Sequence, residues 1–269
     1  MFFLISEKIQ KISLMNRIAL ITGATSGIGK ATAVLLAQNN YNLILTGRRE
    51  EKLTALKEKI TNETDTEIVL LNFDVRSLDE TKAAISALPE QWRNIDVLIN
   101  NAGLAVGFNT VQDGNIDDWE RMIDTNIKGL LYITRLVSPL MIKRQQGHII
   151  NISSIAGKET YPFGNVYCAT KHAVQSVTKG MRIDMLKEGI KVSSVSPGAV
   201  DTEFSLVRFK GNKKKATQVY NGFTPLFAQD IAETILFVLS RPRHVNIDDI
   251  LVMPTDQAFS RDFNRKENS

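Results

Sequence analysis

Residues 22–29 read TGATSGIG, and this stretch decides the fold. It completes the β-rich run RIALITG (17–23) and leads directly into the helical run KATAVLLAQNN. Gly23, Gly27 and Gly29 permit a tight turn, close approach of the backbone to a ligand, and close packing of the helix on the strand. The amino end of a helix adds unpaired N–H groups and a positive dipole. The stretch therefore predicts a strand, turn and helix that bind the pyrophosphate of a dinucleotide.

Six further β-rich runs follow, with helical stretches between them. They are YNLILTG (41–47), EIVLLNFD (67–74), IDVLIN (95–100), GHIINIS (147–153), IKVSSVS (190–196) and DILVM (249–253). Their nearly continuous apolar character is typical of parallel strands that are buried on both faces and joined by right-handed crossovers. The pattern predicts the α/β class: a single-domain Rossmann fold with a doubly wound, seven-stranded parallel sheet and helices on both faces. In such sheets, ligands bind beyond the carboxyl ends of the strands.

The composition is that of an ordinary soluble globular protein, with 43% hydrophobic and 23% charged residues in 269. No stretch approaches the ~20 apolar residues needed to span a bilayer. Residues 1–15, MFFLISEKIQKISLM, lack the basic start and small-residue cleavage site of a signal peptide. We expect them to be a short extension, with Met15 as an alternative start, before one domain over 16–269.

Cysteine and histidine usage argues against a disulfide or a metal site. Cys168 is the single cysteine, which excludes an internal disulfide and agrees with a reducing cytoplasm. The three histidines are scattered without ligand spacing. The net charge of +4 is modest, and the basic run 213–215 is typical of a solvated loop rather than a nucleic-acid site. We expect no metal, no membrane and no nucleic acid.

The end of the second predicted strand, LTGRREE, bears on the choice of dinucleotide. NAD enzymes carry an acidic residue here to hold the ribose hydroxyls, but this chain has Gly47 followed by Arg48 and Arg49. Arginine pairs well with a 2′-phosphate, so the sequence favours NADP. The alternative is that both arginines are solvated or neutralised by the acids that follow them. Asp74, which ends the third strand, either accepts from the adenine amino group or caps its own turn.

Residues 165–173, NVYCATKHA, place Tyr167 and Lys171 four positions apart. On a helix this spacing puts both side chains on one face. A nearby cation favours the phenolate and shifts the phenol pKa from its ordinary value of ~10 toward neutrality. The pair is therefore a candidate acid/base group, and the alternative is a polar patch on a helix.

Five motifs together resemble the short-chain dehydrogenase/reductase superfamily from about residue 16 onward. They are TGATSGIG, NNAG (100–103), Asn126 in DTNIKG, NISSIAG (151–157) and SPGAVDT (196–202). The resemblance implies that Tyr167 is the general acid/base, that Lys171 lowers its pKa and binds the nicotinamide ribose, and that Ser154 bonds the substrate oxygen. It also implies that Asn126 organises a proton-relaying water.

The resemblance further implies a set of cofactor-binding positions around NADP. They are Gly23, Thr25, Ser26, Gly27, Ile28, Gly29, Arg48, Arg49, Asp74, Val75, Asn101, Ala102, Gly103, Tyr167, Lys171, Pro197, Gly198, Val200 and Thr202.

Finer similarity concerns the substrate. The stretches TEFSLVRFKGN, YPFGNVYCATK and VMPTDQA resemble the NADP-dependent 3-hydroxy acid dehydrogenases that act on serine and allo-threonine. The segment near 202–225 is then expected to cover the substrate as a lid. Arg208 or Lys210 is expected to bind the carboxylate beside Ser154 and Tyr167, and the alternative is that both cations pair with acids on a neighbouring subunit or face water. The resemblance also implies a homotetramer, formed through the long helices after the fourth and fifth strands.

Two other functions stay open at this point. One is a reductase of a different carbonyl, such as a 3-oxoacyl or general carbonyl substrate, because one fold serves many alcohols. The other is a catalytically silent NADP-binding regulator, against which the intact set Asn126, Ser154, Tyr167 and Lys171 argues.

Overall fold

The computed structural model describes residues 17–266, and seven of its strands form one parallel sheet. The strands are β1 (Arg17–Ile21), β2 (Tyr41–Gly47), β3 (Ile68–Asn72), β4 (Ile95–Asn100), β5 (Gly147–Ile152), β6 (Ile190–Pro197) and β9 (Asp249–Val252). Their order is β3-β2-β1-β4-β5-β6-β9. This confirms the doubly wound α/β fold. The predicted extension at 1–15 lies outside the described residues.

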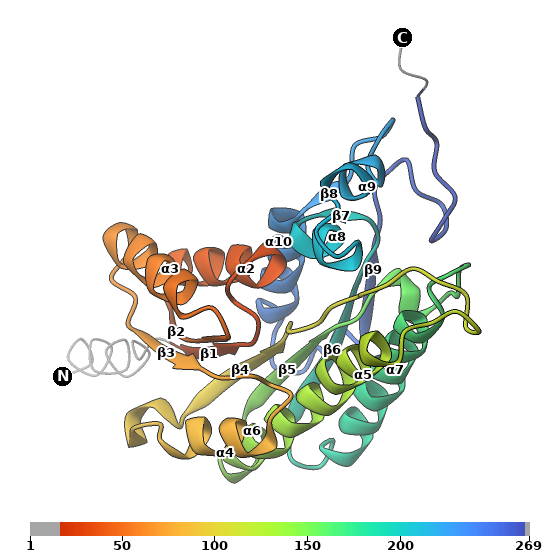
Figure 1. Cartoon of the computed structure of the whole chain (residues 1–269). Coiled ribbons are helices and arrows are strands. Elements are labelled where there is room, and N and C mark those ends of the chain that lie inside the picture. Colours follow the sequence, from red (N-terminus) through yellow and green to blue (C-terminus); the bar gives the residue numbers. More distant parts are fainter. Residues whose placement is uncertain (1–16, 267–269) are drawn as a thin grey trace, which may run out of the picture.

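Helices cover both faces of the sheet (Figure 1). One face carries α2 (Gly27–Gln38), α3 (Glu50–Glu63) and α10 (Ala228–Leu239), and the other carries α4 (Leu78–Ser86), α6 (Leu130–Lys143) and α7 (Asn165–Asp184). Successive strand residues point to opposite faces, so Leu43 and Leu45 enter one buried core while Ile44 enters the other. Two apolar cores therefore hold the sheet rigid between two helical layers, which fixes the strand ends that carry the site.

Short elements complete the chain. They are the single turns η1 (Glu90–Trp92) and η3 (Ile155–Gly157), the helices α5 (Ile116–Ile123), α8 (Glu203–Arg208) and α9 (Lys213–Gln218), the π-helical turn η2 (Asp124–Gly129), and the paired strands β7 (Val200–Asp201) and β8 (Leu226–Phe227). Figure 1 shows α8, α9, β7 and β8 projecting together beyond the sheet. This projecting group contains most of the segment expected to act as a lid.

Among residues 17–266, no helix combines the length and the apolar character that a bilayer crossing requires.

Candidate active site

A cleft of about 900 Å³ opens at the carboxyl edge of the sheet, and it gathers most of the predicted site residues. Its lining includes Gly23, Thr25, Ser26, Gly27, Ile28, Arg48, Arg49, Asp74, Val75, Asn101, Ala102, Gly103, Ser154, Tyr167, Lys171, Pro197, Gly198, Val200, Thr202 and Arg208. Three predicted residues do not line it: Gly29, Asn126 and Lys210. Segments from along the whole chain therefore meet in one site.

The turn after β1 is built for close backbone approach. Gly23 has φ +66°, in the left-handed region that favours glycine. A Cβ at Gly29 would lie 2.4 Å from Asn101 Nδ2 and 2.6 Å from the Gly23 oxygen. Asn101 Nδ2 donates to the carbonyls of Thr22 (2.8 Å) and Gly23 (3.1 Å). Gly29 and the NNAG motif thus hold the turn closed, and the turn can receive a pyrophosphate at the amino end of α2.

The end of β2 has no room for the acidic residue that NAD enzymes use. A Cβ at Gly47 would lie 2.6 Å from Thr25 Cγ2. Arg49 donates to Thr25 Oγ1 from Nε (3.2 Å) and from Nη2 (2.9 Å), so its guanidinium lies against the cofactor turn. Arg48 is more exposed, with Nη1 3.6 Å from Asp74 Oδ2. Two cations without an acid at position 47 fit a 2′-phosphate.

Asp74 closes its own turn after β3. Its Oδ1 accepts from the Arg76 backbone N–H (3.0 Å), and its Oδ2 accepts from Arg76 Nε (2.9 Å) and Nη2 (2.6 Å). Burial acts to raise the pKa of Asp74, but the hydrogen bonds with Arg76 outweigh it and the pKa falls below its usual value. Of the two roles predicted for Asp74, the turn-capping role is present in the structure.

Tyr167 and Lys171 both lie on the first turns of α7 and both are buried. Lys171 Nζ donates to the carbonyl oxygen of Ile152 (2.9 Å) and lies 6.0 Å from the centre of the Tyr167 ring. Burial lowers the pKa of Lys171 to about 8. A Cβ at Gly103 would lie only 3.4 Å from Nζ, so the glycine leaves the ammonium accessible from the cleft.

The pKa of Tyr167 differs from the sequence-based expectation. Burial raises it above its ordinary value, and the nearby Tyr161 adds to this. The charge of Arg208 and a hydrogen bond with Ser154 oppose the rise. Tyr167 is buried, and the Lys171 ammonium is itself desolvated and bonded to the Ile152 oxygen. In this structure the cation that acts on the phenol is Arg208.

Ser154 and Asn126 flank this pair in different ways. The Ser154 hydroxyl accepts from the Ala156 backbone N–H (3.1 Å) and contacts the Pro197 oxygen (3.4 Å) at the end of β6. Asn126 lies in the π-helical turn, where its Oδ1 accepts from Leu104 N–H (2.8 Å) and its Nδ2 donates to the Leu104 oxygen (2.9 Å). The Asn126 side chain therefore braces the wall behind Gly103 rather than entering the cleft.

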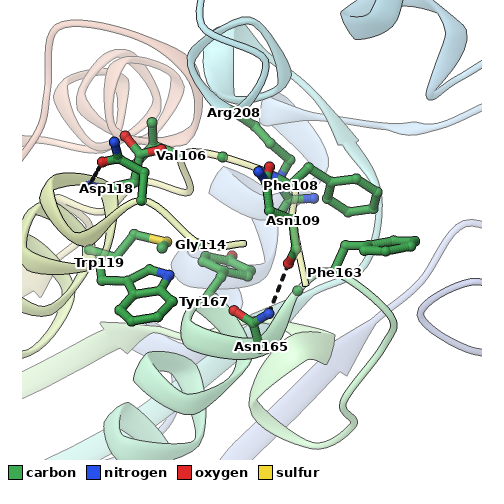
Figure 2. Close-up of a pocket in the computed structure, with 14 residues that line it drawn as sticks. Val106, Phe108, Asn109, Gly114, Asp118, Trp119, Phe163, Asn165, Tyr167 and Arg208 are labelled. Carbon is green, nitrogen blue, oxygen red and sulfur yellow. Dashed lines mark hydrogen bonds between the residues drawn. The ribbon is translucent and has the colours of Figure 1, made fainter. Parts of the chain in front are cut away.

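Arg208 stands over the phenol from the last turn of α8. Its guanidinium carbon lies 4.9 Å from the Tyr167 ring centre and 5.1 Å from the Phe204 ring centre. Its Nη2 donates to the Tyr161 hydroxyl (2.9 Å). Figure 2 shows Arg208 and Tyr167 approaching from opposite sides of a small pocket beside the main cleft. The main cleft is lined by Arg208, Tyr161, Tyr167 and Ser154, so one cation and three hydroxyl groups border it.

Lys210 points elsewhere. Its Nζ pairs with Asp118 Oδ2 (2.7 Å) on the first turn of α5, and the Asp118 side chain is buried. The Gly107 N–H donates to the Arg208 carbonyl (3.1 Å). These two contacts tie the α8 segment to α5 and to the loop after β4. Of the two predicted carboxylate ligands, the structure brings Arg208 to the phenol and joins Lys210 to Asp118.

Three contributors to the site were not predicted: Tyr161, Asp118 and Glu203. Tyr161 lies six residues before Tyr167, a spacing that carries no signal by itself. Glu203 and Asp118 act through ion pairs with residues far away in the sequence. In the described part of the chain, no group of three His, Cys, Asp or Glu side chains converges as a metal site would require.

Comparison with known proteins agrees with this geometry. The family model of the short chain dehydrogenase matches residues 17–212. The chain is 45% identical to the NADP-dependent 3-hydroxy acid dehydrogenase YdfG of Salmonella typhi, over 90% of this chain and 97% of that protein. It is 44% identical to sulfoacetaldehyde reductase 2 of Chromohalobacter salexigens, over 91% and 97%. Its fold matches a closed form of serine dehydrogenase complexed with NADP⁺, with a TM-score of 0.86, 41% identity and coverage of 93% and 100%.

Proposed function

Because the chain belongs to the short-chain dehydrogenase family, we propose that it is an NADP-dependent oxidoreductase acting on the 3-hydroxyl carbon of small 3-hydroxy acids. Substrates of the serine and allo-threonine type are oxidised, and small 3-oxo acids or aldehydes are reduced in the reverse direction. A serine 3-dehydrogenase of Agrobacterium fabrum, 42% identical over 91% of this chain, supports the choice of substrate.

One observation carries the substrate proposal: the Arg208 guanidinium lies 4.9 Å from the ring of the proposed acid/base Tyr167. A 3-hydroxy acid holds its carboxylate two carbons away from the reacting hydroxyl. Arginine offers a planar pair of donors that matches a carboxylate. With the carboxylate on Arg208, the hydroxyl of such an acid reaches Tyr167 and Ser154. The acid group then orients the reacting carbon as well as binding the substrate.

The proposed chemistry assigns a separate task to each side chain. NADP, when bound, accepts hydride from the substrate carbon or returns it as NADPH. Tyr167 exchanges a proton with the substrate oxygen through its hydroxyl. Ser154 donates a hydrogen bond to the same oxygen and stabilises the negative charge that develops on it. Lys171 presents an ammonium near the ring of Tyr167 and holds the nicotinamide ribose.

Burial raises the pKa of Tyr167, so the phenol is protonated at neutral pH. Arg208 and Ser154 lower the pKa of Tyr167, so both favour the return of the proton in the oxidative direction. Asn126 completes the proposed set by bracing Leu104 and the π-helical turn beside Gly103.

We place the cofactor along the cleft from the β2 end to Tyr167. The turn Gly23–Gly29 takes the pyrophosphate, and Arg48 and Arg49 take the 2′-phosphate. The remaining predicted cofactor positions line the same cleft between these points, apart from Gly29, which supports the turn from behind. The absence of a carboxylate at Gly47, beside Arg48 and Arg49, supports NADP over NAD.

A second substrate class deserves the same assay, because Arg208 can hold any small oxyanion. The chain is as similar to a sulfoacetaldehyde reductase as to the hydroxy acid enzymes. A sulfonate presents oxygen acceptors to a guanidinium much as a carboxylate does. Reduction of a sulfonated aldehyde by the same groups is therefore the competing proposal.

A spectrophotometric panel separates these possibilities. Serine, allo-threonine, 3-hydroxypropionate, sulfoacetaldehyde, a 3-oxoacyl thioester and an uncharged alcohol are each offered with the matching form of NADP or NAD. The proposal expects the highest kcat/KM for a small 3-hydroxy acid with NADP. Preference for the sulfonate or the thioester would replace the substrate, and no turnover of any compound would favour a regulatory NADP-binding protein.

We also propose a homotetramer assembled through α6 and α7. Leu131 on α6 is exposed, as are Ile183 at the end of α7 and Leu186 in the turn that follows, and such apolar side chains are suited to a subunit interface. Sedimentation equilibrium tests the assembly, and a monomer at working concentration would contradict it. We also propose a cytoplasmic location, which cell fractionation tests.

A further inference from the structure

The first residue of α8, Glu203, binds two cations at the start of α3. Its Oε2 accepts from Arg49 Nη1 (2.8 Å) and its Oε1 accepts from Lys52 Nζ (2.9 Å). These hydrogen bonds, with Lys52 first, lower the pKa of Glu203 to about 2, so the carboxylate is ionised at neutral pH. Glu203 therefore holds the lid segment against the end of the cleft where the 2′-phosphate is expected.

Arg49 contacts both Glu203 and the cofactor turn in this arrangement. Its Nη1 faces Glu203, while its Nε and Nη2 donate to Thr25 Oγ1 of the cofactor turn. The base of α8 also packs on that turn, because a Cβ at Gly27 would lie 3.3 Å from Thr202 Cβ and Cγ2. Arg49, Thr25 and Glu203 all line the cleft. An anion that enters here meets a cation that already has a carboxylate partner.

A 2′-phosphate needs the same donors. A phosphate monoester carries close to two negative charges and forms its strongest hydrogen bonds with arginine and lysine. Glu203 adds one negative charge at the same two cations, which repels the phosphate and occupies donors that it requires. NAD has no phosphate at this position, so the Glu203 charge affects it little.

We propose that Glu203 is a cofactor-specificity residue, which competes with the 2′-phosphate of NADP for Arg49 and Lys52 and so weakens NADP binding selectively. The inference rests on the cofactor assignment in the proposed function and adds Lys52 to the residues that the phosphate contacts.

The test measures cofactor binding without turnover. Titration calorimetry gives the Kd of NADP⁺ and of NAD⁺ for the full chain and for Glu203→Gln, with the fold checked by circular dichroism. We expect Glu203→Gln to tighten NADP⁺ binding by roughly 2- to 30-fold, the range that two exposed ion pairs allow, with NAD⁺ unchanged. Lys52→Met should weaken NADP⁺ binding and leave NAD⁺ unchanged.

Glu51→Gln is the matched control. Glu51 is an exposed acid on the first turn of α3, and it forms no ion pair within residues 17–266. Replacing Glu51 removes the same charge from the same region, so the Kd of NADP⁺ and the Kd of NAD⁺ should each change by no more than about twofold. If Glu203→Gln does not fold, Glu203→Asp supplies the test, because its shorter carboxylate cannot hold both cations and should give a smaller gain for NADP⁺.

Two outcomes would overturn the inference. Weaker NADP⁺ binding in Glu203→Gln would show that Glu203 holds Arg49 in place for the phosphate. If NADP⁺ and NAD⁺ binding tighten equally, or if Glu51→Gln tightens NADP⁺ binding as much, the effect comes from net charge and not from the position of Glu203. The wild-type protein decides the underlying assignment separately: tighter binding of NAD⁺ than of NADP⁺ would refute the proposed cofactor whatever the variants do.

Discussion

Replacing Arg208 by leucine removes the proposed carboxylate anchor while keeping an apolar side chain against Phe204. The charged group lies 4.9 Å from the Tyr167 ring and bonds the Tyr161 hydroxyl at 2.9 Å. A charge-assisted hydrogen bond contributes about 1.5–3 kcal/mol, so kcat/KM for serine or 3-hydroxypropionate should fall by roughly 10- to 150-fold. An uncharged alcohol of similar size should lose much less, because it has no carboxylate to anchor. Steady-state assays with NADP on both substrates measure the two losses.

Arg208 also acts on the phenol, and this second effect can be separated. Burial raises the pKa of Tyr167 and the charge of Arg208 opposes the rise, so the Leu variant should have a phenol of still higher pKa. The higher phenol pKa affects the charged and the uncharged substrate alike. In the oxidative direction, the pH at which the rate rises should therefore shift upward for both substrates. The ratio of kcat/KM for the charged substrate to kcat/KM for the uncharged substrate cancels this shared effect. That ratio should fall in the variant at every pH.

Lys210→Met is the matched control for this experiment. Lys210 is a cation on the same segment, but its ammonium pairs with Asp118 rather than facing the phenol. Its loss should change the charged and uncharged substrates in parallel. If Arg208→Leu also lowers both in parallel, Arg208 is not the anchor and the reasoning from its position fails. Arg208→Lys, which keeps the charge without the planar fork, should recover part of the ratio.

Four further changes test other parts of the account. Tyr167→Phe should keep the fold and NADP binding but lower kcat by roughly 10²–10⁴-fold, and activity within about tenfold of wild type would refute its role as acid/base. Arg48→Ala should weaken NADP⁺ binding by roughly 10- to 150-fold in a calorimetric titration, and equal losses for NAD⁺ would indicate a structural role instead. Asp118→Asn should lower kcat/KM for charged and uncharged substrates alike, because it releases Lys210 from α5; unchanged kinetics would show that this ion pair does not position the segment. Burial, with a smaller effect from nearby cations, lowers the pKa of His148 from 6.5 to about 3, so the unfolded chain binds the proton more tightly and stability falls as pH drops below 6.5. Urea unfolding should show a loss of roughly 2–3 kcal/mol between pH 6.5 and 4.5 that His148→Gln lacks, and identical profiles would contradict this.

The sheet could be predicted because its strands are buried on both faces. Such strands appear in the sequence as apolar runs, and each run from RIALITG to DILVM corresponds to one strand of the sheet. The paired strands β7 and β8 were not predicted, because two residues are too short to show a pattern. The π-helical turn at Asp124–Gly129 was missed for a different reason: it adds a residue to a helix whose composition stays helical.

The site was predictable wherever a motif is local in the sequence. The four-residue spacing of Tyr167 and Lys171 lies within one helical turn, and the three glycines lie within one short loop. The structure places both motifs in the elements that the sequence predicted. The pKa of Tyr167 was not predictable, because it depends on how completely the phenol is enclosed and on Arg208 from a distant helix. The ion pairs of Glu203 and Asp118 likewise join segments far apart in the chain, and no local spacing encodes them.

The central claim is that the cleft transfers hydride from the 3-carbon of a small hydroxy acid to NADP. The most direct test is to offer 3-hydroxypropionate with both hydrogens at carbon 3 replaced by deuterium, with NADP⁺, and to analyse the reduced cofactor by mass spectrometry. We predict that each turnover places one deuterium on the cofactor and that Tyr167→Phe nearly abolishes the labelled product. Reduced cofactor without deuterium, or label released into water, would contradict hydride transfer from that carbon and with it the proposed reaction.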